Sequence, residues 1–322
     1  MKAAVYYTNG GPEVFRYEDV ADPSVGDFEV LLRVQAISIE GGDTLNRLGG
    51  ELLASPHVVG YQCAGVVEAI GAGVTRVAVG DRVVTTGTNG SHAELRVAGE
   101  AFCWVIPEGL ATDLAACVPI AFGTAHDCLF EFGRLQAGET VLVHAGASGV
   151  GVAAVQLAAQ AGATVIATAS SDERLDRLRQ YGMSHGINYV RDDFVTEVRG
   201  ITGGLGANVI VDSVGGTNLQ KSLHALAYRG RCITFGDAGR SGGGQLDVSS
   251  MRGNNQSLTG YFLGAELFLG TRAHAMIAGL LTDVASGRLE VVIDQTFPLS
   301  AAGDAHAYIE SRRAFGRVLL IP

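Results

Sequence analysis

The sequence His144-Ala145-Gly146-Ala147-Ser148-Gly149-Val150-Gly151 follows an apolar strand-like segment, residues 139–145, and runs into an alanine-rich helix-like segment, residues 150–161. Aligned with G-x-G-x-x-G, it places Gly146 in a tight turn and Gly151 where a helix packs closely on a strand, while Ser148 takes the middle glycine's place. A diphosphate at this turn would meet unpaired N–H groups and the positive end of the helix dipole. The stretch therefore predicts a dinucleotide-binding turn formed by Gly146, Ser148, Gly149, Val150 and Gly151. A purely structural glycine turn is the alternative.

The end of the second predicted strand, residues 164–169, bears on the choice between NAD and NADP. Proteins that bind NAD hold the ribose 2′-hydroxyl with an acidic residue about 20 residues further on, and Ser170 occupies that place here. Ser170, Ser171 and Arg174 offer hydroxyl groups and a positive charge, which suit a 2′-phosphate. Ser171 could also cap the next helix, a role compatible with phosphate binding. We therefore expect NADPH as the cofactor, in preference to NADH.

Hydrophobic periodicity divides the chain into a β-rich part and an α/β part. Up to about residue 105, short strands alternate with turns rich in Gly, Pro and Asp, which is typical of a compact barrel-like domain. From about residue 115, strands alternate with helical segments at a spacing that implies βαβ crossovers and a parallel sheet. Residues 115–132 and 266–286 are each expected to form one long helix. The terminal strand, residues 317–321, has no parallel partner nearby and could return to the first domain.

Charge and composition exclude several classes of protein. The formal net charge is −10, which argues against non-specific binding to nucleic acid or to anionic membranes. No apolar run approaches the ~18 residues of a membrane helix, and the start of the chain lacks the apolar stretch of a signal peptide. The five cysteines show no C-x-x-C spacing. We therefore expect reduced thiols and a cytoplasmic protein that binds neither nucleic acid nor membrane.

Short motifs occur in order along the whole chain. They are Gly10–Val14, Pro56–Gly60, Ala64–Gly71, Gly80–Val83, Gly90–Glu94, Gly138–His144 and Gly316–Pro322. In these motifs the chain resembles the zinc-free medium-chain dehydrogenases/reductases, and within them the quinone oxidoreductase (zeta-crystallin-like) family. The resemblance implies an α/β protein with two domains. They are a GroES-like β-rich catalytic domain, residues 1–121 and 266–322, and a Rossmann domain with a doubly wound parallel sheet, residues 122–265.

The zinc-binding members of this superfamily need a catalytic Cys, a Gly-His-Glu turn and a four-cysteine lobe. Here the turn reads Gly60-Tyr61-Gln62, the position of the catalytic cysteine falls in Ser38-Ile39-Glu40, and the lobe is missing. Zinc prefers tetrahedral Cys and His ligands, and the eight histidines are scattered along the chain. The sequence therefore predicts no metal site.

The resemblance also implies which residues surround the cofactor. Those expected around the 2′-phosphate are Ser171, Arg174, Tyr189 and Arg312, and those expected beside the nicotinamide are Thr124, Phe235 and Gly236. Tyr189 could instead be a core aromatic residue at the end of a strand. Arg312 could instead be a solvated charge at a helix end, and Arg313 competes with it for the phosphate.

One motif departs from the family's pattern. Where the family usually carries Asn-x-x-Asp, with the Asn near the nicotinamide, this chain has Glu40-Gly41-Gly42-Asp43. Asp43 is retained and Glu40 replaces the Asn. The Glu40 carboxylate could act as a proton relay beside the substrate, or it could pair with Arg47. The two glycines would widen the substrate pocket.

A reduced carbonyl oxygen needs a hydrogen-bond donor or a proton. Tyr61 is the first candidate, because its turn replaces the zinc-binding turn and should face the pocket. A tyrosine that only packs against its neighbours is the alternative, and water could supply the proton.

Together these features predict an NADPH:quinone oxidoreductase that works without zinc. An NADPH-dependent 2-alkenal or enoyl double-bond reductase shares the fold, the cofactor and the hydride, so it is the alternative among enzymes. A non-catalytic NADPH-binding (crystallin-like) protein is the alternative of another class. The resemblance further suggests a homodimer paired through edge strands near residues 257–263.

Overall fold

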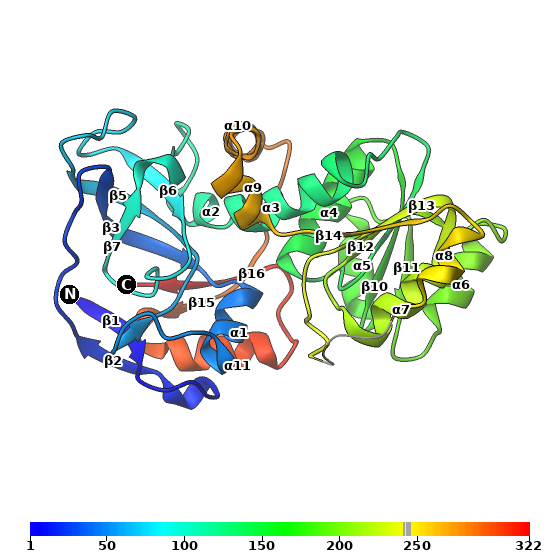
Figure 1. Ribbon diagram of the computed structural model, residues 1–322, viewed down its shortest axis with the longest axis horizontal. Helices are drawn as coiled ribbons and strands as arrows, with labels where there is room; N and C mark the ends of the chain where they lie inside the picture. Colours follow the sequence, from blue (N-terminus) through cyan, green and yellow to red (C-terminus); the bar gives the residue numbers. More distant parts are fainter. Residues whose placement is uncertain (241, 243–245) are drawn as a thin grey trace. The chain divides into compact units, whose positions relative to one another are not determined.

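The computed structural model describes residues 1–240, 242 and 246–322. The chain forms two compact units, one made of Met1–Ile120 together with Gly264–Pro322 and the other of Ala121–Leu263 (Figure 1). The first unit thus combines both ends of the chain, and the second unit is its continuous middle part.

The second unit is built on a six-stranded sheet in which all neighbouring strands run parallel. Its strand order is β11 (His185–Asn188), β10 (Thr164–Ala169), β9 (Thr140–Val143), β12 (Ala207–Asp212), β13 (Leu226–Thr234) and β14 (Ser257–Gly260). Its helices include α4 (Gly149–Gln160), α5 (Asp172–Arg179), α6 (Phe194–Ile201), α7 (Gly216–Ala225) and α8 (Val248–Arg252). This is the predicted Rossmann sheet, and the α/β fold class is confirmed.

Five strands of this sheet contribute to one core. The buried side chains in the cluster include Ile187, Ile166, Leu142, Ile210 and Cys232, one from each of β11, β10, β9, β12 and β13. Strands of a parallel sheet are covered on both faces and therefore read as nearly continuous apolar runs. That property explains why the sequence pattern located these strands.

The first unit contains a seven-stranded sheet and a three-stranded sheet. The larger has the order β15 (Ile293–Pro298), β16 (Arg317–Ile321), β3 (Glu29–Ser38), β5 (Gln62–Ile70), β6 (Arg82–Thr86) and β8 (Cys103–Val105), with β7 (Leu95–Gly99) also paired to β3. The smaller has the order β2 (Arg16–Asp19), β1 (Lys2–Tyr6) and β4 (His57–Val58). The helices are α1 (Gly41–Gly49), α2 (Thr112–Ala116), α9 (Leu263–Leu269), α10 (Arg272–Ala285) and α11 (Ala302–Glu310). This unit is the GroES-like part of the predicted fold.

Two segments that we expected to be single helices are divided, so those expectations were wrong. Within residues 115–132, α2 ends before α3 (Val118–His126), and a π-helical turn comes after α3. Pro119 lacks the N–H that would continue α2, but it fits the first turn of α3. Within residues 266–286, Gly270 lies between α9 and α10, and glycine is a poor helix former.

The terminal strand β16 returns to the first unit, where it runs antiparallel to β3. It also has a parallel partner, β15, so the expectation that no such partner lies nearby was wrong. β15 has the sequence IDQTFP and no fully buried side chain. It therefore lacks the apolar alternation by which a strand is found in a sequence.

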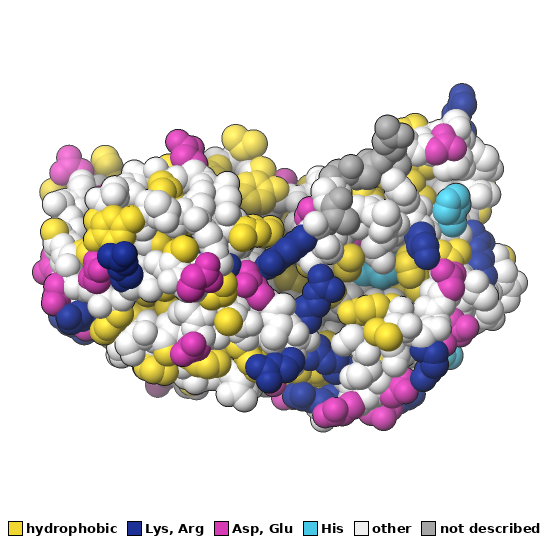
Figure 2. All heavy atoms as spheres, turned by 90° about the horizontal axis from the view of Figure 1, so that it is seen from below, with side chains coloured by type: hydrophobic (Ala, Val, Ile, Leu, Met, Phe, Trp, Pro, Cys, Tyr) yellow, Lys and Arg dark blue, Asp and Glu magenta, His cyan; other side chains and the backbone are white. Residues whose placement is uncertain are grey.

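Acidic side chains are spread among the basic ones over the face that Figure 2 shows. In the part of the chain that the structure describes, no helix is long and apolar enough to cross a membrane.

Two glycine substitutions test how tightly the glycine-rich turn is packed. A Cβ on Gly151 would lie 2.4 Å from the Ala145 carbonyl oxygen, whereas a Cβ on Gly200 would meet nothing within 4 Å. Gly151→Ala should therefore lower the free energy of unfolding by about 1–3 kcal/mol. Gly200→Ala should raise it by up to about 1 kcal/mol through helix propensity. Urea denaturation followed by circular dichroism measures both, and equal midpoints for the two variants would contradict the packing argument.

Candidate functional site

The glycine-rich turn has the predicted strand–turn–helix form. It begins after β9, and Ala145 adopts a left-handed conformation with φ 49°. The Gly146 N–H donates to the Thr168 carbonyl oxygen over 2.8 Å, which ties the turn to β10. Ser148 caps α4, because its hydroxyl oxygen accepts from the Gly151 N–H over 3.1 Å. Ser148 therefore has a structural task of its own where the pattern has its middle glycine.

Both outer glycines of the turn are required by close contacts. A Cβ on Gly146 would lie 2.9 Å from the Ala167 side chain, and one on Gly151 would collide with backbone oxygens. The turn thus leads directly into the N-terminus of α4, where N–H groups and the helix dipole favour an anion.

Residues at the ends of β10 and β11 lie together, as the sequence predicted for a 2′-phosphate site. Ser171 caps α5 and accepts from the Arg174 N–H over 3.4 Å. The Tyr189 N–H donates to the Ala169 carbonyl oxygen over 3.1 Å, next to Ser170. The Tyr189 side chain is 44% exposed, so the alternative of a core aromatic residue is wrong.

The nearest carboxylate to these residues in sequence, that of Asp172, is already engaged. It accepts from the Asn188 side chain over 3.2 Å and from Arg191 over 3.0 Å. These two hydrogen bonds hold the pKa of Asp172 below its ordinary value. Arg191, which belongs to none of the sequence motifs, comes after β11 and adds a positive charge to this edge of the sheet.

Unpartnered polar atoms lie just beyond β12 and β13. Among the described residues, the Ser213 hydroxyl and one Asp237 carboxylate oxygen are buried without a hydrogen-bond partner. Phe235 and Gly236 lie directly before Asp237, and a Cβ on Gly236 would lie 2.9 Å from the Ser213 carbonyl oxygen. Unsatisfied buried polar groups are costly, so this edge fits a ligand rich in hydroxyl and amide groups. Thr124, on α3, is buried in the same unit.

Arg312 belongs to the first unit, directly after α11. It is exposed and adopts φ 57°. The guanidinium group of its competitor Arg313 lies over the Tyr308 ring, 5.2 Å from the centroid. The role of Arg312 at a phosphate stays a prediction.

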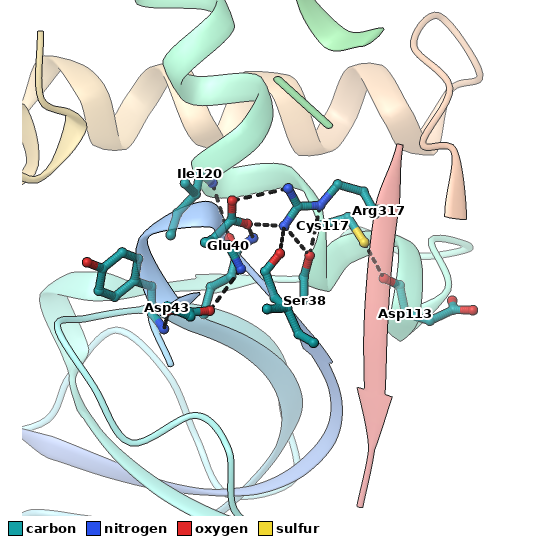
Figure 3. A network of polar contacts seen from close by, with 10 residues as sticks. Ser38, Glu40, Asp43, Asp113, Cys117, Ile120 and Arg317 are labelled. Carbon is teal, nitrogen blue, oxygen red and sulfur yellow. Dashed lines mark hydrogen bonds and ion pairs between the residues drawn. The ribbon is translucent and has the colours of Figure 1, made fainter. Parts of the chain in front are cut away.

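Glu40 lies in a buried polar network at the end of β3 (Figure 3). Its two carboxylate oxygens accept from the Arg317 guanidinium, and one of them also accepts from the Gln62 side chain. Arg317 also donates to the Ser38 hydroxyl and to the Ile39 carbonyl oxygen. Burial raises the pKa of Glu40, and the charge and hydrogen bonds of Arg317 lower it in part. Both carboxylate oxygens are thus bound inside the protein.

The alternative expectation, that Glu40 pairs with Arg47, was wrong. Arg47 is fully buried and binds Glu310, at 2.6 Å, and the His306 ring, at 3.0 Å. The reason lies in helix geometry: Glu40 caps α1, and Arg47 leaves that helix nearly two turns later, toward α11.

Asp43 is fully buried below the Tyr61 turn. One of its oxygens accepts from the Glu40 N–H over 2.8 Å and the other from the Tyr61 N–H over 3.1 Å. Burial raises the pKa of Asp43 to about 8, although these backbone hydrogen bonds oppose the shift. Asp43 therefore joins the start of α1 to the Tyr61 turn.

The glycine pair does not act as predicted. A Cβ on Gly42 would lie 2.2 Å from an atom of the Tyr61 ring, whereas one on Gly41 would meet nothing within 4 Å. The Tyr61 ring thus takes the space that Gly42 leaves, and the expectation that this glycine widens a pocket was wrong.

Arg317 is the residue that the sequence analysis missed in this network. Its guanidinium lies against Ser38, Ile39 and Glu40, the stretch expected to correspond to the catalytic cysteine of zinc-binding members of the superfamily, and Glu40 in turn binds Gln62, which follows Tyr61. Among the described residues, no three His, Cys, Asp or Glu side chains gather as they would around a metal ion. One feature of the sequence could have indicated this network, namely the lone arginine in the apolar strand RVLLI. A buried charge requires a buried partner.

Breaking this ion pair should destabilise the protein. Glu40→Gln leaves the Arg317 charge buried without its counter-charge, which costs about 3–5 kcal/mol. The double variant Glu40→Met/Arg317→Met removes both charges and should lose less than the single variant. Chemical denaturation of the three proteins measures the difference. A Glu40→Gln protein as stable as the unmodified one would show that the pair does not hold the unit together.

Comparisons with known proteins agree with this architecture. Residues 26–118 match the alcohol dehydrogenase GroES-like domain family, and residues 149–278 match the zinc-binding dehydrogenase family. A 2-haloacrylate reductase of a Burkholderia species is 35% identical, and the match covers 100% of this chain and 99% of the relative. A quinone oxidoreductase of Pseudomonas aeruginosa is 36% identical over 97% of each chain. The solved structure of Escherichia coli quinone oxidoreductase complexed with NADPH has a TM-score of 0.94 at 28% identity, with 100% of both chains covered.

Proposed function

Because the chain belongs to the quinone oxidoreductase family of the medium-chain dehydrogenases/reductases, we propose that it is an NADPH-dependent reductase of quinones that works without zinc. The choice of NADPH over NADH rests on the residues at the end of β10. Ser170 stands where an NAD-binding protein has its acidic residue, and the neighbouring Asp172 carboxylate is held by Asn188 and Arg191. The negative charge of Asp172 is thus partly offset by Arg191.

The residues fit NADPH in three places along the sheet. The diphosphate would lie on Gly146–Gly151, at the N-terminus of α4. The 2′-phosphate would be held by Ser170, Ser171, Arg174 and Tyr189, with Arg312 as a further candidate. The nicotinamide half would lie by Thr124, Phe235 and Gly236, where the unpartnered polar atoms of Ser213 and Asp237 would gain partners. When bound, NADPH would supply a hydride.

Tyr61 would donate a hydrogen bond, and then its proton, to the carbonyl oxygen of the acceptor as that oxygen gains negative charge. Burial raises the pKa of Tyr61 to about 12, with a further contribution from the Asp43 charge, while a hydrogen bond with Asn46 opposes the shift. The phenol would therefore remain protonated, and able to donate, throughout the neutral pH range.

The proposal that zinc takes no part rests on the side chains that replace the zinc ligands. Tyr61 and Gln62 stand in the turn that holds a metal in zinc-binding members of the superfamily. The Arg317 cation binds Ser38 and Glu40 in the segment that would carry the cysteine ligand. Because both Glu40 carboxylate oxygens are bound by Arg317, they are not free to ligate a metal, and the cysteine and histidine ligands that zinc prefers are replaced.

A second candidate function is the reduction of an activated carbon–carbon double bond. The observation that favours it is the likeness to a 2-haloacrylate reductase, whose name denotes a substrate with a double bond conjugated to a carboxyl group. Both reactions need a hydride and a donor to the carbonyl oxygen, so the same residues serve either. A non-catalytic NADPH-binding protein is the candidate of another class.

The first test compares NADPH and NADH with a benzoquinone, a naphthoquinone and a 2-alkenal as acceptors. Rapid quinone reduction with NADPH alone supports the proposal, and turnover of the alkenal alone moves the function to double-bond reduction. Tight NADPH binding without turnover of any acceptor favours the non-catalytic protein.

Arg174→Ala tests the 2′-phosphate site. Loss of a charged hydrogen bond worth about 1.5–3 kcal/mol should weaken NADPH binding about 10- to 100-fold and leave NADH binding unchanged. Arg177→Ala, in the same helix, is the matched control and should change neither affinity. Calorimetric titration measures all three proteins. Equal losses for NADPH and NADH would contradict recognition of the phosphate by Arg174.

We also propose that the protein is a homodimer paired through β14. This strand lies at the edge of the parallel sheet, beyond β13, and an exposed edge offers unpaired N–H and C=O groups to a second copy. Sedimentation equilibrium measures the oligomeric state.

A further inference from the structure

Tyr61 lies along one face of helix α1. Its ring lies against Gly42, where a Cβ would be 2.2 Å from a ring carbon and 2.8 Å from the hydroxyl oxygen. Asn46 comes four residues after Gly42, so both occupy the same face of the helix. The Asn46 side chain, on this face, lowers the pKa of the Tyr61 phenol in part. The helix therefore contacts both the ring and its polar end.

The main chain of Tyr61 is held from both sides. Its N–H donates to the Asp43 carboxylate over 3.1 Å. Its carbonyl oxygen accepts from the Gly87 N–H over 2.8 Å and from the Arg96 guanidinium over 2.9 Å. We call Asp43, Gly87 and Arg96 the Tyr61 anchor.

Arg96 is buried, with 3% of its surface exposed. Besides Tyr61, its guanidinium contacts the Asn89 carbonyl oxygen at 3.1 Å and the Cys63 thiol at 3.6 Å. Burying a cation is costly unless it is well hydrogen-bonded. These contacts offset part of that cost, although the Arg96 Nε is buried without a partner, and they fix the conformation of the loop around Tyr61.

Polar and apolar side chains occupy the face of α1 along which Tyr61 lies. Leu45 comes three residues after Gly42 and is 40% exposed, so it occupies the same side of α1 as Asn46. A carbonyl compound with an apolar body matches this combination of one phenol, one amide and one exposed leucine.

We propose that Gly42, together with the Tyr61 anchor, positions Tyr61 as the proton donor for an apolar carbonyl acceptor. The inference rests on the proposed reductase function. In the step, a hydride with its two electrons would reach an electron-poor atom conjugated with the carbonyl, the conjugated double bond would shift toward the carbonyl carbon, and the carbonyl π electrons would move onto oxygen, so that protonation of this oxygen gives an enol or a hydroquinone. The Tyr61 O–H bond breaks, an O–H bond forms on the acceptor oxygen, and water returns a proton to the phenolate. Gly42 and Arg96 act only through Tyr61 and are positioning residues.

The test is a double-mutant cycle between Tyr61→Phe and Gly42→Ala. Loss of a general acid lowers the rate about 10²–10⁴-fold, so Tyr61→Phe should lower kcat by that factor with whichever acceptor, quinone or 2-alkenal, the unmodified protein reduces. Gly42→Ala displaces the ring and should lower kcat by a similar factor, while the dissociation constant of NADPH stays unchanged in both variants. The double variant should be no slower than Tyr61→Phe alone. Losses that multiply in the double variant would overturn the proposal.

Gly49→Ala is the matched control, because it adds the same methyl group to the same helix where nothing lies within 4 Å. It should leave kcat unchanged. Arg96→Lys keeps the charge but loses the planar fork, and it should lower kcat while leaving the NADPH dissociation constant as it is.

Titration of the Tyr61 phenol, followed by NMR of ¹³C-labelled tyrosine with Tyr61→Phe for assignment, separates this inference from the proposed function. Burial raises the pKa of the Tyr61 phenol to about 12, so displacement of the ring by Gly42→Ala should shift that pKa toward the ordinary value of about 10. If the unmodified protein reduces no acceptor, the proposed function fails. The positioning by Gly42 still holds if the shift is seen, and it fails if the titration is the same in both proteins.

Discussion

The buried ion pair between Arg317 and Glu40 is the contact on which the first unit depends. It joins the start of the last strand, β16, to the end of β3, across 277 residues of sequence. Two charges removed from water are stabilised only if each keeps its partners, and here Ser38, Gln62 and the Ile39 carbonyl supply the remaining hydrogen bonds. Without the C-terminal segment the Glu40 carboxylate would be left uncompensated. The pair therefore makes the two ends of the chain one folding unit.

The same pair fixes the point at which helix α1 begins. The helix starts at the residue after Glu40, and Asp43 in its first turn binds the backbone of both Glu40 and Tyr61. The ring of Tyr61 then takes the space above Gly42. In the proposed function, a cation, a carboxylate and a tyrosine take the place of the metal that zinc-binding members of the superfamily use. The proposed chemistry depends on this exchange, because a phenol rather than a metal ion would stabilise the charge on the substrate oxygen.

The sequence predicted those features that local patterns determine. Gly146 and Gly151 lie in a strand–turn–helix arrangement whose signals are all within a few residues, and the apolar strands of the parallel sheet were found in the same way. Helix α1 escaped notice because two glycines at its start conceal the helical pattern. The partners of Glu40 and Tyr61 could not be foreseen, since Arg317 and Arg96 reach them across 277 and 35 residues. Such contacts depend on the pairing of strands, which periodicity alone does not give.

The central claim is that a fixed Arg–Glu pair and a tyrosine replace a metal ion in this family member. The most direct measurement is the rate of quinone reduction with NADPH before and after exhaustive treatment with a strong chelator, with the zinc content determined in the same samples. The account predicts an unchanged rate in protein that holds no stoichiometric zinc. A rate that is lost with the chelator and restored by added zinc would contradict it.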